Sequence, residues 1–461
     1  MLTELSIKNF KAWRDTGNIR LAPITVFFGS NSAGKTSILQ FLLMLRQTAE
    51  SPDRHRVLHP GDRNTPVELG TFRDLIFEHN LSNQIEFGMS WNLPEPMAVR
   101  DPLSRQTISG TRVHFEASIA SDSKGAQQQV KKFQYLLANG GTSLTVEMKP
   151  SESGGPSKVP YELSADNYKL VRNPGRPWKL PPPIRFYAFP DEVGAYFQNA
   201  GFTSDLALEL EKQLKRLQYL GPLRIYPERS YIWSGEVPEH VGWRGERAVE
   251  AMLAAAARNI GPGYRRKTQP FQAVIARWLQ ELGLLQSFEV HQIAAHRKEY
   301  EVMVRAGNTR ESVNLPDVGF GVSQVLPVVV QSFYANPHTT IILEQPEIHL
   351  HPRVQTSLAD LFIETVQSRE DGTDRSIQLI IESHSEHFLR RLQTRLAEGV
   401  VKPEEVALYF CSTAGEGAVL EPLEVNIFGE IQNWPKDFFG DEMGELAARM
   451  AAAARHEAKS Q

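Results

Sequence analysis

Apolar residues follow one another with little interruption in three stretches of the chain: 24–30 (ITVFFGS), 339–345 (TTIILEQ) and 377–385 (IQLIIESHS). Runs of this length that are rich in β-branched residues are typical of strands buried on both faces. A segment of helical length and composition follows each run, at 36–47, 353–368 and about 386–398. Strands that alternate with such helices predict a mainly parallel sheet.

Other segments alternate apolar and polar residues, as strands with one solvated face do. They comprise an edge strand that turns in LSIKNFKAW (5–13), three strands at 85–91, 113–119 and 144–148, and two strands within 288–305. We therefore expect an antiparallel β subdomain beside the parallel sheet, in a protein of the α/β class. Further helices are expected at 204–220 with Ser204 as its cap, at 245–256, at 271–285, and at 322–335 with Pro327 in its first turns.

Composition limits the broad class of the protein. Its 461 residues include 41% apolar and 23% charged residues, carry a formal net charge of −4, and contain no apolar run long enough for a membrane span. We expect a cytoplasmic protein without a membrane partner, because the N-terminus has no signal-peptide pattern. The single cysteine, Cys411, excludes an internal disulfide and is expected to be buried and inert.

The segment GSNSAGKT (29–36) fits the phosphate-binding pattern G-x-x-x-x-G-K-[ST] in full. It lies between a predicted buried strand and a predicted helix, where backbone N–H groups and the helix N-terminus can face phosphates. We expect Lys35 to reach the β- and γ-phosphates of ATP, and the Thr36 hydroxyl to bind Mg²⁺. The predicted ATP-binding residues in this loop are Gly29, Ser30, Asn31, Ser32, Ala33, Gly34, Lys35, Thr36 and Ser37.

A strand that ends in acids precedes the helix predicted at 353–368. Glu344 is the expected second Mg²⁺ ligand, as the acid of a neighbouring strand. Gln345 can orient a water but cannot accept its proton, whereas Glu347, two residues further on, can accept one. A first-turn helix acid is an equally good interpretation of Glu347. His349 and His351 could form a metal pair, although loop residues at a subunit contact are the favoured interpretation.

The order of the motifs LSIKNFKAW, GSNSAGKTS, DVGFGVSQVLPVVV, IILEQPEIHLHP and IIESHSEHFL resembles ABC-type ATPase heads of the SMC, RecF and overcoming-lysogenization-defect kind. The chain looks closer still to stand-alone bacterial AAA-family ATPases that share YLGPLR, VGWRGE and a C-terminal segment of unknown function. The resemblance covers about 1–90 and 205–440. It implies a P-loop NTPase fold of the ABC-head type and a homodimer or higher oligomer around ATP.

In that family a signature loop of one protomer faces the ATP of the other. The resemblance places the signature loop at 319–324, with Ser323 donating to the γ-phosphate across the interface. It also makes His384 the switch histidine that contacts the γ-phosphate. The ATP-contacting residues of this loop would be Gly319, Gly321, Ser323 and Gln324. Most such heads carry a second acid where Gln345 stands, so we expect slow hydrolysis with Glu347 compensating.

We divide the chain into five parts on this basis. They are an N-terminal ATPase lobe (1–91), an inserted β and loop region rich in turn formers (92–203), a helical and strand lobe (204–310), a C-terminal ATPase lobe (311–411) and a tail (412–461).

Two functions remain open. The first is an ATP-driven switch or sensor in a nucleic-acid-related complex for anti-phage defence or DNA repair. The second is a largely non-hydrolysing ATP-bound scaffold that holds a separate effector protein. A transporter motor is disfavoured by the insert. Arg224, Arg229, Arg244, Arg247 and residues 263–269 could line a nucleic-acid path, but internal ion pairs explain them as well. The role of GTFRD (70–74) is left open.

Overall fold

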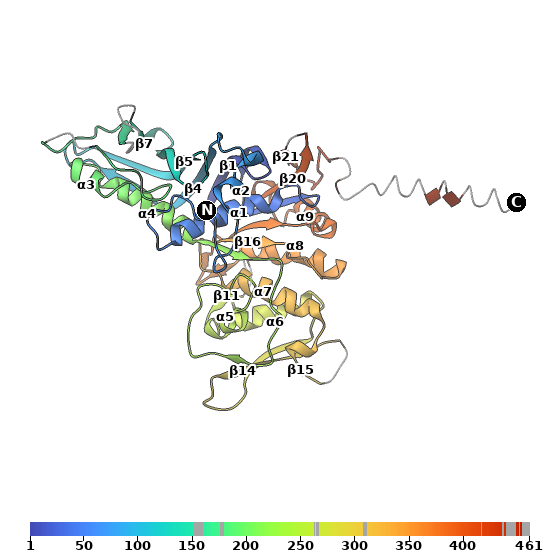
Figure 1. Ribbon diagram of the computed structural model, residues 1–461. Helices are drawn as coiled ribbons and strands as arrows, with labels where there is room; N and C mark the ends of the chain where they lie inside the picture. The colour runs from blue at the N-terminus through green and yellow to red at the C-terminus, as the bar shows by residue number, and fades with distance from the viewer. Residues whose placement is uncertain are drawn as a thin grey trace.

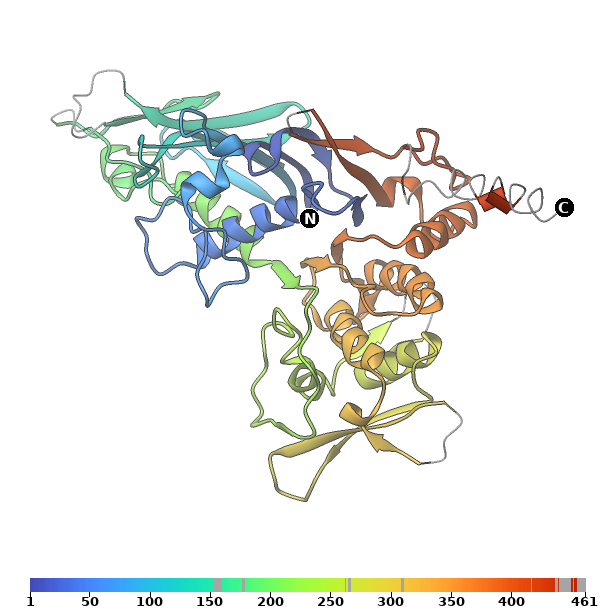
Figure 2. The same cartoon turned by 45° about the vertical axis from the view of Figure 1, so that its right-hand side comes forward.

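The computed structural model describes the chain except for residues 152–159, 176–178, 262, 264–266, 308–310, 416, 436–437, 439–448, 451 and 454–461. Two parts of the molecule are visible in Figures 1 and 2. The upper part carries the N-terminus and long blue and cyan strands, and the lower part carries most of the yellow and orange segments. Among the residues described, no helix combines the length and the apolar character needed to cross a bilayer.

A six-stranded sheet lies at the centre of the fold, in the order β21-β20-β3-β19-β16-β9. Its strands are β3 (Ile24–Gly29), β9 (Leu217–Leu220), β16 (Thr340–Glu344), β19 (Gln378–Glu382), β20 (Val406–Ala414) and β21 (Gly417–Pro422). The first five pair in parallel, and only β21 is antiparallel to its neighbour. The predicted mainly parallel sheet is therefore confirmed, and so is its α/β class.

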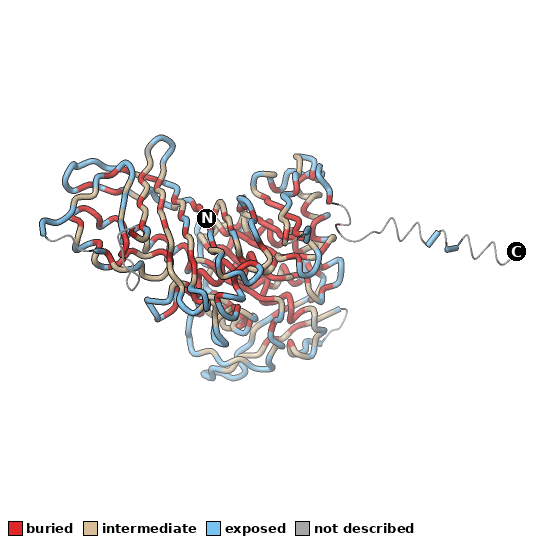
Figure 3. The backbone as a smooth tube through the Cα atoms, turned by 45° about the horizontal axis from the view of Figure 1, so that its top comes forward, coloured by how far each residue is buried: buried red, intermediate tan, exposed pale blue. Residues whose placement is uncertain are grey.

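Both faces of this sheet are buried, which explains the continuous apolar runs. Phe27, Ile342 and Ile380 face one hydrophobic core. Their neighbours along the same strands, such as Val26, face a second core. Figure 3 shows the buried residues as a continuous red zone through the middle of the molecule.

The upper part is built on a seven-stranded antiparallel sheet, in the order β2-β1-β4-β5-β6-β7-β8. Its strands are β1 (Leu2–Phe10), β2 (Trp13–Arg20), β4 (Ile85–Arg100), β5 (Thr107–Ser121), β6 (Gln128–Asn139), β7 (Thr142–Pro150) and β8 (Tyr161–Asp166). The predicted boundary at residue 91 falls inside β4, because the region read as an insert continues the same sheet. β1 is an inner strand, so the edge position predicted for it is wrong, since β2 covers its free side.

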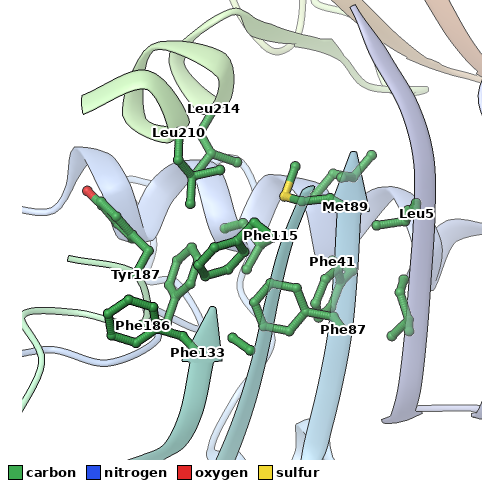
Figure 4. Packing of buried hydrophobic residues seen from close by; sticks show 14 of the residues in the cluster. Leu5, Phe41, Phe87, Met89, Phe115, Phe133, Phe186, Tyr187, Leu210 and Leu214 are labelled. Carbon is green, nitrogen blue, oxygen red and sulfur yellow. The ribbon is translucent and has the colours of Figure 1, made fainter. Parts of the chain in front are cut away.

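Helices α1 (Lys35–Glu50) and α4 (Phe202–Lys215) cover one face of this sheet. Figure 4 shows aromatic side chains of the strands beneath these helices, with Phe87 and Phe115 at the centre and Leu210 and Leu214 of α4 above them. The rings of Phe41 on α1 and Phe87 on β4 meet edge to face with centroids 5.1 Å apart. The helix that begins at the phosphate loop is thereby fixed to the antiparallel sheet.

The lower part packs helices against the other face of the parallel sheet. The helices are α5 (Ala248–Ala254), α6 (Phe271–Glu281), α7 (Phe320–Tyr334), α8 (Pro352–Gln367) and α9 (Glu386–Ala397). One small sheet joins β10 (Tyr231–Ile232), β13 (Ser287–Gln292), β14 (Glu299–Arg305) and β15 (Val313–Asn314); a second joins β11 (Asn259–Gly261), β12 (Gln269–Pro270), β17 (Arg369–Glu370) and β18 (Thr373–Asp374). The two strands predicted within 288–305 are thus confirmed as β13 and β14.

Two further sequence predictions need correction. The helix predicted at 204–220 ends as α4 at Lys215, and residues 217–220 form the edge strand β9, whose apolar side chains are all buried. The cap position of α4 is Gly201, so Ser204 lies inside the helix. The predicted tail boundary at 412 falls inside β20, which continues to Ala414 and pairs with β21. Two short helices, α2 (Phe72–Leu75) and α3 (Glu192–Tyr196), complete the described helices of the upper part.

Candidate nucleotide site

The phosphate loop connects β3 to α1, as its sequence predicts. Gly29 has φ 139°, and a Cβ at this position would lie 2.0 Å from the carbonyl oxygen of Cys411 on the neighbouring strand. Gly34 has φ 86° and immediately precedes α1. The Trp13 indole N–H donates to the Gly34 carbonyl over 3.0 Å. Both glycines are therefore required by the backbone, and the end of the loop is anchored to β2.

Lys35 occupies the first position of α1 and is 3% exposed. Its ammonium group donates to the carbonyl oxygens of Gly29 (3.1 Å) and Ser30 (2.7 Å). Burial lowers the pKa of Lys35, and the nearby carboxylate of Glu382 opposes that effect. The ammonium group thus lies inside the loop that is expected to hold phosphates.

Two acids end adjacent strands of the parallel sheet. Glu344 closes β16 and Glu382 closes β19, and the two residues are paired in register. A Glu382 carboxylate oxygen accepts a hydrogen bond from the Thr36 hydroxyl over 3.1 Å. Burial raises the pKa of Glu344 to about 8, and the charge of Glu382 adds to the rise. Burial also raises the pKa of Glu382, against the effects of Thr36, Lys35 and Gln345.

The turn after β16 holds the Glu347 side chain against the backbone at His384. Gln345 has φ 42°, and its N–H donates to the Glu382 carbonyl over 2.9 Å. Glu347 is 6% exposed, and its carboxylate accepts the backbone N–H of His384 over 2.6 Å. Burial raises the pKa of Glu347, and the hydrogen bond from His384 opposes this.

Arg224 is a buried cation close to these residues. Its guanidinium donates to the carbonyl oxygens of Glu344 (3.3 Å) and Gln345 (3.5 Å). Burial lowers the pKa of Arg224 to about 10, against the attraction of Glu347. Arg224 therefore supports the turn between Glu344 and Glu347. Of the two interpretations that the sequence allowed for Arg224, a nucleic-acid path and an internal role, these contacts favour the internal role.

A cavity of about 360 Å³ opens above the loop. It brings Gln345, Glu382 and His384 together with the loop, whereas neither Glu344 nor Glu347 lines it. Burial lowers the pKa of His384, and Lys35 lowers it further, so both effects favour the neutral imidazole. The lining residues are Lys11, Ala12, Asn31, Ser32, Ala33, Gly34, Lys35, Thr36, Ser37, Gln40, Gln345, Glu382 and His384.

The expected signature loop lies outside this cavity. Gly319 is exposed and immediately precedes α7, whereas Ser323 (6% exposed) and Gln324 (1%) are buried within the helix that follows. Gly321, in the first turn of α7, is partly exposed. Residues 223–232 contact the segment that precedes the signature loop. The Tyr226 hydroxyl donates to the Pro316 carbonyl over 2.9 Å, and Arg229 forms an ion pair with Asp317.

Other sequence candidates have local roles. The His351 ring accepts the Arg353 N–H (3.3 Å) at the cap of α8. No group of three or more His, Cys, Asp or Glu side chains able to hold a metal occurs among the residues that the structure describes.

In GTFRD, Thr71 and Asp74 form a capping box for α2. Arg244 donates to the Leu223 carbonyl and Arg247 pairs with Glu236. Of residues 263–269, positions 264–266 lie outside the described residues.

Sequence reasoning did not select Glu382 or Lys11. Glu382 could have been found, because it ends an apolar strand two residues before His384, just as Glu344 ends the strand before Gln345. Lys11 gave no signal, because it reaches the cavity from the β1–β2 turn, 24 residues before Lys35 in the sequence. Its ammonium group donates to the Gln40 amide oxygen over 2.6 Å.

Residues 24–390 match a family model described as "AAA domain, putative AbiEii toxin, Type IV TA system". That match runs from the strand before the phosphate loop into α9 and covers well over half of the chain. The chain belongs to this AAA domain family. Residues 401–448 match a second family, described as a protein of unknown function (DUF3696). The predicted resemblance to P-loop ATPases with a C-terminal segment of unknown function is confirmed.

Three solved structures of SMC heads match 92% of this AAA-family chain. They are a head bound to the C-winged helix domain of ScpA (10% identity, TM-score 0.45, 98% of that chain), a Thermotoga maritima head (12%, 0.39, 99%) and a head with an extended coiled coil bound to the C-terminal domain of ScpA derived from Pyrococcus furiosus (10%, 0.41, 96%). A search among curated proteins gave no match.

Proposed function

We propose that this AAA-family protein binds ATP with Mg²⁺, hydrolyses it slowly, and pairs with a second copy of itself around the nucleotide. The observation that carries the proposal is the cavity in which the complete phosphate loop meets Gln345, Glu382 and His384. A loop of backbone N–H groups at a helix N-terminus favours a polyphosphate, and Lys35 adds a cation inside it.

The residues at the cavity fit a divalent cation. The Thr36 hydroxyl and a strand-end carboxylate are hard oxygen donors of the kind that Mg²⁺ prefers. When bound, Mg²⁺ would neutralise charge on the phosphate oxygens. Gln345 can orient the attacking water from the rim of the cavity, and the neutral His384 can face the terminal phosphate. The acid–base role that the sequence predicts for Glu347 is untested, and the Glu347 side chain does not line the cavity.

The position of the signature loop supports the proposed pairing of two copies. Gly319 and Gly321 precede and open α7, so the helix N-terminus is free to face an anion that does not belong to the same cavity. Membership of the AAA family and the resemblance to SMC and RecF heads favour a switch in a nucleic-acid-related defence or repair complex.

The alternative is an ATP-bound scaffold that holds a separate effector. It is favoured by one observation, the amide of Gln345 at the rim of the cavity, where a second acid would activate water. General-base help is worth about 10²–10⁴-fold in rate, so its absence would leave a long-lived ATP complex.

Lys35→Ala tests the shared part of both functions. We expect it to abolish ATP binding in calorimetry, because the phosphates lose the one lysine within the loop. Lys212→Ala, on the exposed face of α4, is the matched control and should bind as the parent does. Tight binding by Lys35→Ala would refute nucleotide binding at this cavity. Release of phosphate by the parent, measured at saturating ATP, then separates the slow ATPase from the scaffold.

A further inference from the structure

The two strand-end acids differ in what their carboxylates contact. Glu382 is 2% exposed, and one of its oxygens holds the Thr36 hydroxyl. Within the described structure its second oxygen is buried without a hydrogen-bond partner. Glu344 is instead next to β9, where the Tyr219 hydroxyl acts to lower its pKa against the effect of burial. Thus only Glu382 both contacts the phosphate loop and lines the cavity.

We propose that Glu382, rather than Glu344, is the carboxylate that binds the Mg²⁺ of the nucleotide together with Thr36. This inference rests on the proposed function and assigns its metal site. The Thr36 hydroxyl donates a hydrogen bond to Glu382, so the lone pairs of the hydroxyl oxygen can ligate a cation beside the carboxylate. The unpartnered second oxygen of Glu382 supplies a further hard ligand.

The strand order of the parallel sheet explains why Glu382, and not Glu344, lies next to the phosphate loop. β19 lies between β3 and β16, so the end of β19 is the direct neighbour of the phosphate loop, and the end of β16 is one strand further away. Glu382 is paired in register with Phe27, two residues before Gly29. Glu344 sits beside Glu382 and close to Tyr219, and it does not line the cavity.

The test compares Glu382→Gln with Glu344→Gln, two isosteric changes at one register position on adjacent strands. Mn²⁺ binding to the full chain is measured by electron paramagnetic resonance with a non-hydrolysable ATP analogue, and melting curves confirm that both variants fold. We expect Glu382→Gln to weaken Mn²⁺ binding about ten- to a hundredfold, as loss of a ligand or its supporting partner does. Glu344→Gln should weaken it by less than about threefold, because the Glu344 side chain does not line the cavity and its raised pKa keeps it largely uncharged at neutral pH.

The outcomes separate this inference from the proposed function. If the parent binds no ATP analogue, the proposed function fails. If the parent binds the analogue and Mn²⁺ and only Glu344→Gln loses the metal, or both variants lose it equally, the assignment to Glu382 is overturned while nucleotide binding stands. A Glu382→Gln variant that binds Mn²⁺ as the parent does also overturns it.

Discussion

The buried carboxyl of Glu344 should make the metal-free protein less stable as the pH rises. Its side chain is 7% exposed, and burial together with Glu382 raises its pKa from 4.5 to about 8. Between these two values the folded chain keeps a proton that the unfolded chain has released. Stability then falls with increasing pH, because the native state binds more protons than the unfolded state. The stability that this group contributes at low pH is lost as the pH rises toward 8.

The size of the effect follows from the two pKa values. Between pH 5.5 and 7.5 the free energy of unfolding should fall by about 2.5 kcal/mol through this group alone, at about 1.4 kcal/mol per pKa unit. Glu344→Gln removes the titrating group and keeps the side-chain shape. Urea unfolding followed by tryptophan fluorescence in EDTA, at both pH values, measures the difference between the parent and this variant.

Comparison with the variant isolates Glu344 from the other titrating groups. Burial lowers the pKa of His240 and His384, and these residues make stability rise with pH in both proteins. The parent should therefore lose about 2.5 kcal/mol more than Glu344→Gln over this interval. Equal losses in the two proteins would show that Glu344 is ionised in the folded state, and would refute the reasoning from burial.

Two other predictions concern the signature loop and the cysteine. Apart from its chain neighbours, a Cβ at Gly319 would meet no heavy atom of the described residues within 4 Å, so Gly319→Glu should fold normally and yet place an anion against the partner's ATP. It should abolish association driven by a slowly hydrolysed ATP analogue in light scattering, and Gly319→Gln, the neutral control of equal size, should weaken association less; unchanged association in both would place the dimer on another surface. Cys411 is fully buried and burial raises the pKa of its thiol to about 12, so the folded chain should resist alkylation at pH 8 until urea unfolds it. Rapid labelling without urea would contradict the burial.

Local signals predicted the elements that surround the nucleotide site. The run ITVFFG became β3 because the strand is buried on both faces, and GSNSAGKT became the loop because Gly29 and Gly34 take backbone conformations that glycine favours. Likewise α8 and α9 begin within a residue of their predicted starts, His351 and Ser385 providing caps. In these cases the information lies within a few neighbouring residues.

The parts that were missed depend on distant pairing. LQYL (217–220) continues the helical pattern of α4, and only its pairing with β16 makes it a strand. The region after residue 91 looked like an insert because its turn-rich composition hides the continuity of β4 with β1 and β5. Glu382 was passed over for a similar reason. The position of Glu382 beside the phosphate loop depends on β19 lying between β3 and β16, and the sequence does not show the order of strands in a sheet.

The last prediction concerns the acid that helps the attacking water. The sequence favoured Glu347. In the structure its carboxylate accepts the backbone N–H of His384 and does not line the cavity. Two substitutions separate the roles. Glu347→Gln keeps an oxygen that can accept the His384 N–H and loses the ability to take a proton, whereas Glu347→Asp keeps the acid and withdraws it by one methylene.

We expect the hydrogen bond to matter more than the acid. The single-turnover rate of ATP hydrolysis should therefore be less than about tenfold lower in Glu347→Gln than in the parent. This is well short of the 10²–10⁴-fold cost of a lost base, and Glu347→Asp should be the slower of the two variants. Gln345→Glu, which introduces a carboxylate at the rim of the cavity, should accelerate hydrolysis toward the same 10²–10⁴-fold range. If instead Glu347→Gln loses 10²-fold or more, Glu347→Asp stays active and Gln345→Glu changes little, then Glu347 is the base. In that case its side chain must leave His384 when ATP binds, because the hydrogen bond of 2.6 Å and a proton taken from water in the cavity require different positions of the same carboxylate.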